Sequence, residues 1–184
     1  AGTRLGAVRR RRHRGRGAVT GTRLSAVAAE NPEAYIAEDR RRALAVGLTL
    51  PERTRGAALF ADISGFTPLT EALVAEFGAQ RGAEELSSIL DRLFDVLLGQ
   101  LHEHGGSAIS FSGDAVTCWL DGDDGFLATS CALAMQHAMA SAGLVTLASG
   151  RRVNLAMKIA IAVGDARRFV VGDPRVQLLD VLAG

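Results

Sequence analysis

The stretch GAALFADISGFTPLT, residues 56–70, contains the change of pattern on which the fold prediction rests. Its first eight residues form a nearly continuous apolar run, which is typical of a central strand covered on both faces. One carboxylate, Asp62, stands where this run stops, and a Ser-Gly-Phe-Thr turn follows it. A charge at the end of a buried strand needs a hydrogen-bond network or a metal ion as its partner. The rest of the chain has to supply one or the other.

Patterns on both sides of this stretch predict alternating helices and strands. Thr67 and Pro68 form an N-cap and first-turn pair that opens a helix ending at Gly78, a plausible C-cap. A second helix carries seven apolar residues on one face: Leu86, Ile89, Leu90, Leu93, Phe94, Leu97 and Leu101. The predicted elements are a helix at 31–42, a strand at 56–63, helices at 67–78 and from about 83 to 104, strands at 107–111 and 115–120, a helix at 126–141, a strand at 153–163 and a further one at 167–172.

This order is that of an α+β fold, the ferredoxin-like split βαβ core with an antiparallel sheet and one additional helix. In that topology the first and third strands are antiparallel neighbours, so the end of the first at Asp62 lies beside the start of the third at Asp114. Two such carboxylates repel each other unless a divalent cation lies between them. The alternative is that Asp62 caps its turn and Asp114 belongs to an ordinary hairpin.

The turn at residues 64–67 leads into a helix N-terminus, where free backbone N–H groups and the helix dipole favour an anion such as a phosphate. Carboxylate oxygens with phosphates nearby suit Mg²⁺ or Mn²⁺ and not zinc. The residues thus predict a site for a metal ion and a nucleoside triphosphate.

Charge divides the chain into a basic beginning and an acidic remainder. The first 24 residues hold eight Arg and no Asp or Glu, whereas the rest carries 13 Lys or Arg against 20 Asp or Glu. Such a leader buries too little apolar surface to fold, so we expect residues 1–30 to be disordered, 31–55 to be a short helix and linker, and 56–184 to be one globular domain. The leader could attract nucleic acid or anionic lipid. Because the chain starts at Ala and stops without a closing element, we expect a C-terminally truncated piece of a longer protein.

Two further features bear on location. Cys118 and Cys131 have no metal-ligand spacing, so they are interpreted as small buried residues of a reducing compartment, most simply the cytoplasm. The apolar segment 126–148 contains Gln136 and His137 and lacks a basic flank on its N-terminal side, which favours a buried helix over a membrane span.

Two motifs carry a resemblance to a known family. FADISGFT, residues 60–67, resembles the first metal motif of class III nucleotidyl cyclases, and ISFSGDAVTCW, residues 109–119, resembles their hairpin with the second metal Asp. Residues 81–95, HGG at 104–106 and residues 157–173 are most similar to the first cyclase domain of soluble, bicarbonate-responsive adenylyl cyclases and their bacterial multidomain relatives. The resemblance covers about residue 35 to the end.

The resemblance implies conversion of ATP to cyclic AMP and pyrophosphate, with two Mg²⁺ or Mn²⁺ ions, at the interface of two cyclase domains. Asp62 and Asp114 would hold both ions together with the backbone carbonyl of Ile63. The N–H groups of Gly65, Phe66 and Thr67 would bind phosphates, and Lys158 matches a family lysine near the terminal phosphate.

The sequence departs from the family at the base-selecting and transition-state positions. Cyclases that pair identical domains have a Lys four residues before the second metal Asp, where this chain has Ser110. Their VNxAxR motif follows the last strands, whereas VNLAMK here precedes one, so Asn154 is interpreted as a strand-start residue. The chain therefore resembles the metal-bearing half of a pair, which leaves ATP against GTP open.

Two other function classes remain. A catalytically silent regulatory or dimerisation module would keep the fold without turnover, and the loss of Lys at position 110 favours it. A nucleic-acid-binding protein would depend on residues 1–24 and on low salt. Two convergent carboxylates favour the enzyme, because a purely structural module has no need of them.

Overall fold

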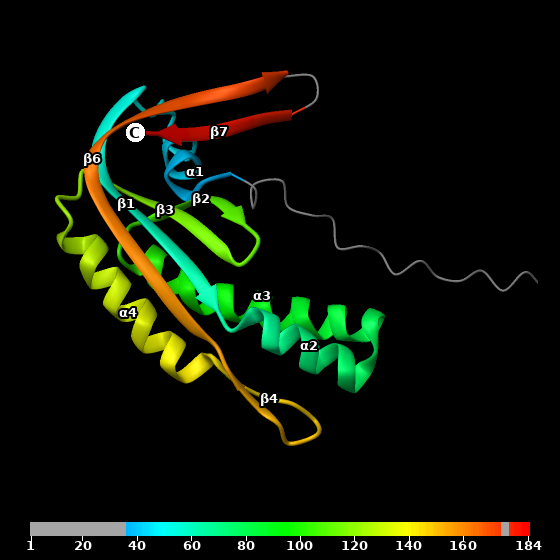
Figure 1. Ribbon diagram of the computed structural model, residues 1–184. Coiled ribbons are helices and arrows are strands. Elements are labelled where there is room, and N and C mark those ends of the chain that lie inside the picture. Colours follow the sequence, from blue (N-terminus) through cyan, green and yellow to red (C-terminus); the bar gives the residue numbers. More distant parts are fainter. Residues whose placement is uncertain (1–35, 174–176) are drawn as a thin grey trace, which may run out of the picture. The chain divides into compact units, whose positions relative to one another are not determined.

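The strand predicted at 56–63 is the central element of the molecule. The computed structural model describes residues 36–173 and 177–184, and in it β1 (Arg53–Ser64) lies between β3 and β6 in a five-stranded antiparallel sheet of order β2-β3-β1-β6-β7 (Figure 1). A small second sheet pairs β4 with β5. The remaining elements are α1 (Glu38–Ala45), α2 (Phe66–Phe77), α3 (Ala79–Glu103), β2 (Ser107–Ser112), β3 (Ala115–Asp121), α4 (Phe126–Ala142), β4 (Leu144–Thr146), β5 (Arg152–Asn154), β6 (Ala156–Asp173) and β7 (Gln177–Ala183).

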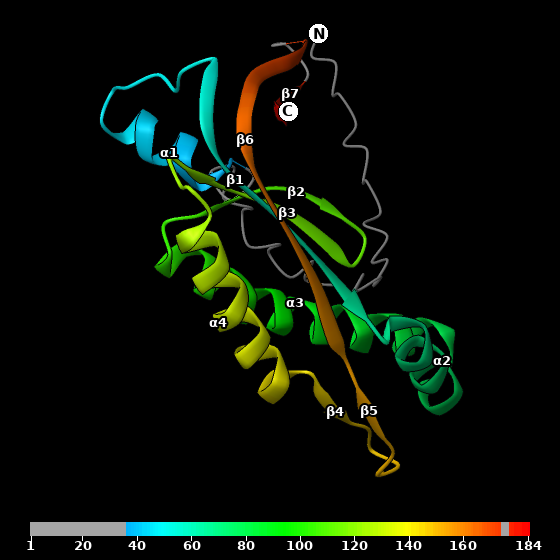
Figure 2. The same cartoon turned by 60° about the vertical axis from the view of Figure 1, so that its left-hand side comes forward.

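The α+β class and the ferredoxin-like arrangement are confirmed. The strands β2, β3, β1 and β6 occupy the positions that the split βαβ pattern predicts, and β7 adds one more strand beside β6. The helices α3 and α4 lie on the same side of the sheet, and the β4–β5 hairpin extends beyond the start of β6 (Figure 2).

The core lies between this sheet and the helices. Alternate residues of β1 are buried toward the helices, namely Ala57, Leu59, Ala61 and Ile63. The predicted apolar face of α3 packs against them, with Ile89, Leu93, Leu97 and Leu101 buried. Because the other face of β1 carries Phe60 and Asp62, the metal-site candidate lies on the sheet face opposite the core.

Several boundaries differ from the sequence prediction. The helix α3 begins at Ala79 and not at about 83, so it includes Gly82. The helix α2 approaches closely at this glycine, since a Cβ at Gly82 would lie 3.1 Å from the backbone of Leu73. The helix predicted at 31–42 begins at Glu38 and continues to Ala45, whereas residues 1–35, which include the leader predicted to be disordered, lie outside the described residues. The strand β1 already begins at Arg53, within the segment interpreted as a linker.

The last third of the chain departs most from the prediction. The strand expected at 153–163 is two strands separated at Leu155, which is buried and whose N–H donates to the carbonyl of Gly143. The segment 167–172 is not a separate strand, since it continues β6 to Asp173. The strand β7, which pairs antiparallel with the second half of β6, was not predicted.

The apolar segment 126–148 contains a helix of the core. Ala128, Cys131, Met135 and Met139 form the buried side of α4, as expected for a buried or half-buried helix. In the part of the chain that the structure describes, no helix combines the length and the apolar character needed to cross a membrane.

Both cysteine thiols are expected to be unreactive in the folded protein. Cys118 and Cys131 are free and fully buried. Burial, with a smaller contribution from the neighbouring Cys131, raises the pKa of Cys118 to about 12, and burial raises the pKa of Cys131 to about 11. Because the thiolate is the reactive form, a thiol reagent at neutral pH should titrate neither cysteine in the native protein and both in denaturant. Rapid reaction of either thiol before unfolding would contradict this.

Candidate metal and phosphate site

Asp62 and Asp114 lie at the same end of the β1–β3 pair. The register pairs Asp62 with Ala115, and the N–H of Ile63 donates to the carbonyl oxygen of Asp114 over 3.1 Å. Both residues are half-buried. The two carboxylate-bearing residues therefore occupy adjacent positions across the strands, as the topology predicts, although Asp114 lies in the turn just before β3. Their role as metal ligands stays a prediction.

The side chains of Asp62 and Asp114 differ from the carboxylates at the far end of β3 and in the loop after it, because they have no protein partner. Asp121 accepts hydrogen bonds from Thr54 and Trp119, and Asp123 accepts from the N–H groups of Leu127 and Ala128 at the start of α4. Among the described residues, neither the Asp62 nor the Asp114 side chain accepts a hydrogen bond or forms an ion pair. The cap that would explain Asp62 without a ligand is thus not formed.

The turn after β1 places a helix N-terminus beside Asp62. Gly65, with φ +94°, is the N-cap of α2, so the predicted cap at Thr67 is wrong, and Thr67 and Pro68 belong to the first turn. No side-chain hydrogen bond caps this end within the described residues. The first N–H groups of α2 follow directly on the strand that carries Asp62, which is where a phosphate would be stabilised.

Gly65 is also enclosed by the β4–β5 hairpin, which the sequence prediction did not connect with the site. A Cβ at Gly65 would lie 2.9 Å from the carbonyl oxygen of Asn154 and 3.3 Å from Leu155. At the other end of the hairpin, Ser149 donates to both carboxylate oxygens of Glu76 on α2, over 2.7 Å from its N–H and 2.6 Å from its hydroxyl. The hairpin therefore lies close to the start of α2 and is hydrogen-bonded to its last turn. Glu76 and Ser149 are 73 residues apart, and no sequence pattern indicated their contact.

We expect Gly65→Ala to weaken the site through both the backbone and the hairpin. An L-residue at this φ costs about 1–2 kcal/mol, and displacing the carbonyl of Asn154 adds to that cost, so the loss of stability should reach about 2–4 kcal/mol. Gly105→Ala is the matched control, because Gly105 also has a positive φ, +77°, but nothing lies within 4 Å of its added Cβ. Urea unfolding measures both. Equal losses in the two variants would show that the hairpin contact contributes nothing.

Lys158 on β6 is the cross-strand neighbour of Asp62 on β1. The β1–β6 register pairs the two residues, so their side chains share a face, and Lys158 is exposed. It is the only lysine in the 184 residues, whereas the other 20 basic residues are arginines. A compact ammonium group on a flexible stem therefore stands beside the unpartnered carboxylate, on the neighbouring strand.

Two positions from the motif comparison have clear places in the fold. Ser110 on β2 pairs with Thr117 of β3, next to the bulge between Ala108 and Ser110. Asn154 ends β5 and pairs with Leu144, so it belongs to the hairpin. Asn154 is thus the last residue of a strand, so the interpretation as a strand-start residue is wrong, and its carbonyl contributes to the enclosure of Gly65.

The carboxylates of Asp62 and Asp114 with the carbonyl of Ile63 form a set of oxygen donors that suits a hard cation whose remaining ligands come from the substrate and water. In the described part of the chain, no group of three or more His, Cys, Asp or Glu side chains gathers into a metal site. Two carboxylates and a backbone carbonyl would leave about half of an octahedral Mg²⁺ or Mn²⁺ shell to phosphates and water, which is a usual arrangement for these ions. A zinc site, with three or four side-chain ligands, would not be built this way.

The comparisons with known proteins agree with this geometry. Over 119 residues, 64% of this chain, the sequence is 29% identical to rabbit (Oryctolagus cuniculus) adenylate cyclase type 10, and the match spans 7% of that protein's length. No family model matches the sequence. Among solved structures, the adenylyl cyclase CyaB from P. aeruginosa aligns with a TM-score of 0.57 and 22% identity over 72% of this chain and 66% of that one. The guanylyl cyclase Cya2 aligns with a TM-score of 0.57 and 23% identity over 72% and 64%. The chain therefore resembles the catalytic domains of class III adenylyl and guanylyl cyclases, in sequence through adenylate cyclase type 10 and in fold through solved cyclase domains.

Proposed function

We propose that this chain is the metal-bearing half of a class III nucleotidyl cyclase that converts ATP to cyclic AMP and pyrophosphate. The observation that carries the proposal is the pair Asp62 and Asp114, two carboxylates without protein partners in the described residues, brought to one end of the sheet beside the N-terminus of α2. The similarity to adenylate cyclase type 10 supports ATP as the substrate. GTP remains the competing substrate, since Cya2 shares the fold.

In the proposed reaction, each residue has a defined part. Asp62, Asp114 and the carbonyl of Ile63 would hold the divalent cations, the N–H groups of Gly65, Phe66 and Thr67 would bind phosphate oxygens, and Lys158 would contact the terminal phosphate. When bound, two such ions lower the pKa of the ribose 3′-hydroxyl and neutralise the triphosphate. The 3′-oxygen attacks the α-phosphorus, the bond from that phosphorus to the bridging oxygen breaks, pyrophosphate leaves, and the hydroxyl proton passes to water.

A second cyclase domain is part of the proposal. Ser110 stands where a base-selecting Lys is expected, so the site needs residues from elsewhere to recognise the purine. The sheet face that carries Asp62 also exposes Phe60, at 45%, which is an apolar group suited to cover by a partner. We therefore propose an active site at the interface with another cyclase domain, in the same longer chain or in a second one, working in cyclic nucleotide signalling in the cytoplasm.

The single lysine gives a direct test of nucleotide binding. An amine-reactive acylating reagent, with peptide mass spectrometry as readout, measures the labelling rate of Lys158 without interference from other lysines. We expect Mn²⁺ with a non-hydrolysable ATP analogue to slow this labelling at least about fivefold, since a bound phosphate occupies the ammonium group. The analogue without metal should have little effect. Labelling that is indifferent to metal and analogue together would contradict nucleotide binding at this site.

Turnover distinguishes the enzyme from the silent module that Ser110 favours. The chain combined with a second cyclase domain and Mn²⁺ should form 3′,5′-cyclic AMP from ATP, detected by mass spectrometry, and the ratio to cyclic GMP formed from GTP gives the base preference. Protection of Lys158 without any cyclic product in that assembly would identify a nucleotide-binding module that does not catalyse.

A further inference from the structure

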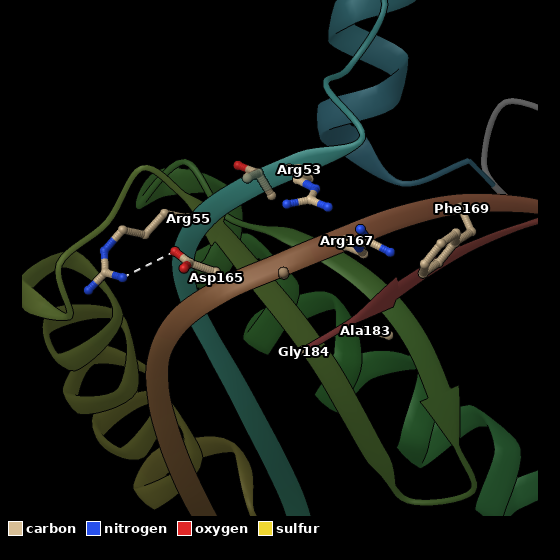
Figure 3. Close-up of a pocket in the computed structure, with 9 residues that line it drawn as sticks. Arg53, Arg55, Asp165, Arg167, Phe169, Ala183 and Gly184 are labelled. Atoms are coloured by element: carbon tan, nitrogen blue, oxygen red, sulfur yellow. Dashed lines mark hydrogen bonds and ion pairs between the residues drawn. The ribbon is translucent and has the colours of Figure 1, made fainter.

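Several arginines line a cavity at the other end of β1, away from the candidate metal site. A cavity of about 580 Å³ opens between the start of β1, the middle of β6 and the end of β7 (Figure 3). Its lining includes Arg53, Arg55, Asp165, Arg167 and Phe169. Arg53 precedes Asp62 by nine positions on the same strand, about 30 Å at the usual strand rise. The cavity therefore does not belong to the candidate metal site.

The sheet register places two positive charges directly opposite each other in this cavity. Arg53 of β1 pairs with Arg167 of β6, and a backbone hydrogen bond of 2.8 Å from Arg168 to Glu52 keeps the strands together at this point. Like charges at opposed positions destabilise a sheet. In the described residues neither guanidinium has a carboxylate partner. The next pair along the strands is neutralised, since Arg55 lies 3.1 Å from Asp165 (Figure 3).

An aromatic wall adjoins the two guanidinium groups. Phe169 follows Arg167 by two positions on β6, so both side chains lie on one face, and Figure 3 shows them side by side with Arg53 opposite. Phe169 is 37% exposed. Across β6, Arg167 pairs with Ala183 of β7, which lines the cavity together with Gly184. The cavity has the volume of a small-molecule site, about 300–1,000 Å³.

We propose that this cavity binds a small phosphate-bearing ligand, with the phosphate between Arg53 and Arg167 and a planar group against Phe169. The planar fork of arginine matches two phosphate oxygens at once, and two opposed forks without a counter-charge supply the donors and the charge for one phosphate. The adjoining ring accommodates the base of a mononucleotide, as aromatic side chains do by stacking. Bound ligand would connect β1, β6 and β7.

The test separates this site from the metal centre by removing metal. Inorganic phosphate, pyrophosphate and AMP are titrated by calorimetry into the chain with a chelator present and at constant ionic strength. We expect all three to bind, AMP most tightly. Arg53→Gln with Arg167→Gln should weaken binding at least about tenfold. Arg151→Gln with Arg152→Gln removes the same charge from exposed positions of the β4–β5 hairpin, outside the cavity, and should leave binding unchanged.

Three further outcomes decide the proposal. Asp62→Asn with Asp114→Asn should retain phosphate and AMP binding in this cavity. The binding would then stand even if the proposed cyclase function failed its own tests. Because the charge repulsion is relieved, the Arg53→Gln, Arg167→Gln variant should unfold at the same or a higher temperature than the wild type without ligand, which shows that lost binding is not lost folding. Phe169→Ala should weaken AMP binding more than phosphate binding. The proposal is overturned if no ligand binds below about 1 mM, or if both arginine double variants lose binding equally.

Discussion

Asn substitutions at Asp62 and Asp114 together are expected to abolish metal-dependent nucleotide binding and to lower turnover of an assembled cyclase by at least about a thousandfold, roughly 4 kcal/mol of transition-state stabilisation. The physical reason is that these carboxylates are the only acidic side chains that the β1–β3 register brings to this end of the sheet in the described residues. Without their charge, an Mg²⁺ or Mn²⁺ ion has only carbonyls, water and the substrate as ligands.

The same double variant should fold normally. Neither side chain has a hydrogen-bond or ion-pair partner among the described residues, so the substitution removes charge repulsion and breaks no polar interaction, and the free energy of unfolding should stay the same or rise by up to about 1 kcal/mol. Calorimetry with Mn²⁺ and a non-hydrolysable ATP analogue measures binding, and urea unfolding measures stability.

Asp91→Asn with Asp95→Asn is the matched control, because it removes two exposed carboxylates from α3. The control should bind like the wild type. Unchanged metal-dependent binding in the Asp62, Asp114 variant would remove the basis of the proposed function, and a large loss of stability would mean that the two carboxylates have structural partners instead.

Arg168→Met is expected to cause the largest loss of stability, about 3–5 kcal/mol, because it leaves the mostly buried carboxylate of Asp39 without its counter-charge. The Arg168 side chain is 3% exposed, and its Nη2 lies 2.5 Å from Asp39 of α1 and 3.5 Å from Asp121 of β3. The N–H of Asp39 also donates to Ser107 of β2 over 2.8 Å. This cluster therefore attaches α1 to three strands of the sheet.

Arg55→Met tests the same chemistry at the surface. The Arg55–Asp165 pair has side-chain exposures of 69% and 83%, so its loss should cost less than about 0.5 kcal/mol. Combining Arg168→Met with Asp39→Asn should recover part of the stability, since the second change removes the isolated buried charge. Urea unfolding of the four proteins measures both effects. A loss for Arg168→Met no larger than that for Arg55→Met would show that the buried cluster is not required.

The cluster also gives stability a dependence on pH. Partial burial acts to raise the pKa of Asp121, but hydrogen bonds from Thr54 and Trp119 and the charge of Arg168 outweigh it and lower the pKa. A carboxyl group with a lowered folded pKa contributes stability that is present above the unfolded value, near 3.9, and is lost as the pH falls through the folded value. Stability should therefore decrease below about pH 4, and this decrease should be smaller in Arg168→Met.

The sequence by itself determined the central strand, the long helices and the meeting of Asp62 with Asp114. These features follow from local signals: a continuous apolar run for β1, a helical repeat of Leu residues for α3, and a short turn between two apolar segments for β2 and β3. Once the order of elements indicated the ferredoxin-like sheet, its antiparallel β1–β3 pair fixed which two acids lie together. This was confirmed by the register.

Only the tertiary structure decided how that site is supported. The cap at Gly65, the enclosure of this glycine by Asn154, and the Glu76–Ser149 contact depend on where the β4–β5 hairpin packs. The Arg53–Arg167 pair depends on the length and curvature of β6 and its register with β1. These contacts join residues that are far apart in the chain, and side-chain patterns record whether a position is buried but not which distant residue it meets. The pairing of strands and the packing of a loop are set by the whole fold, so they became visible only with it.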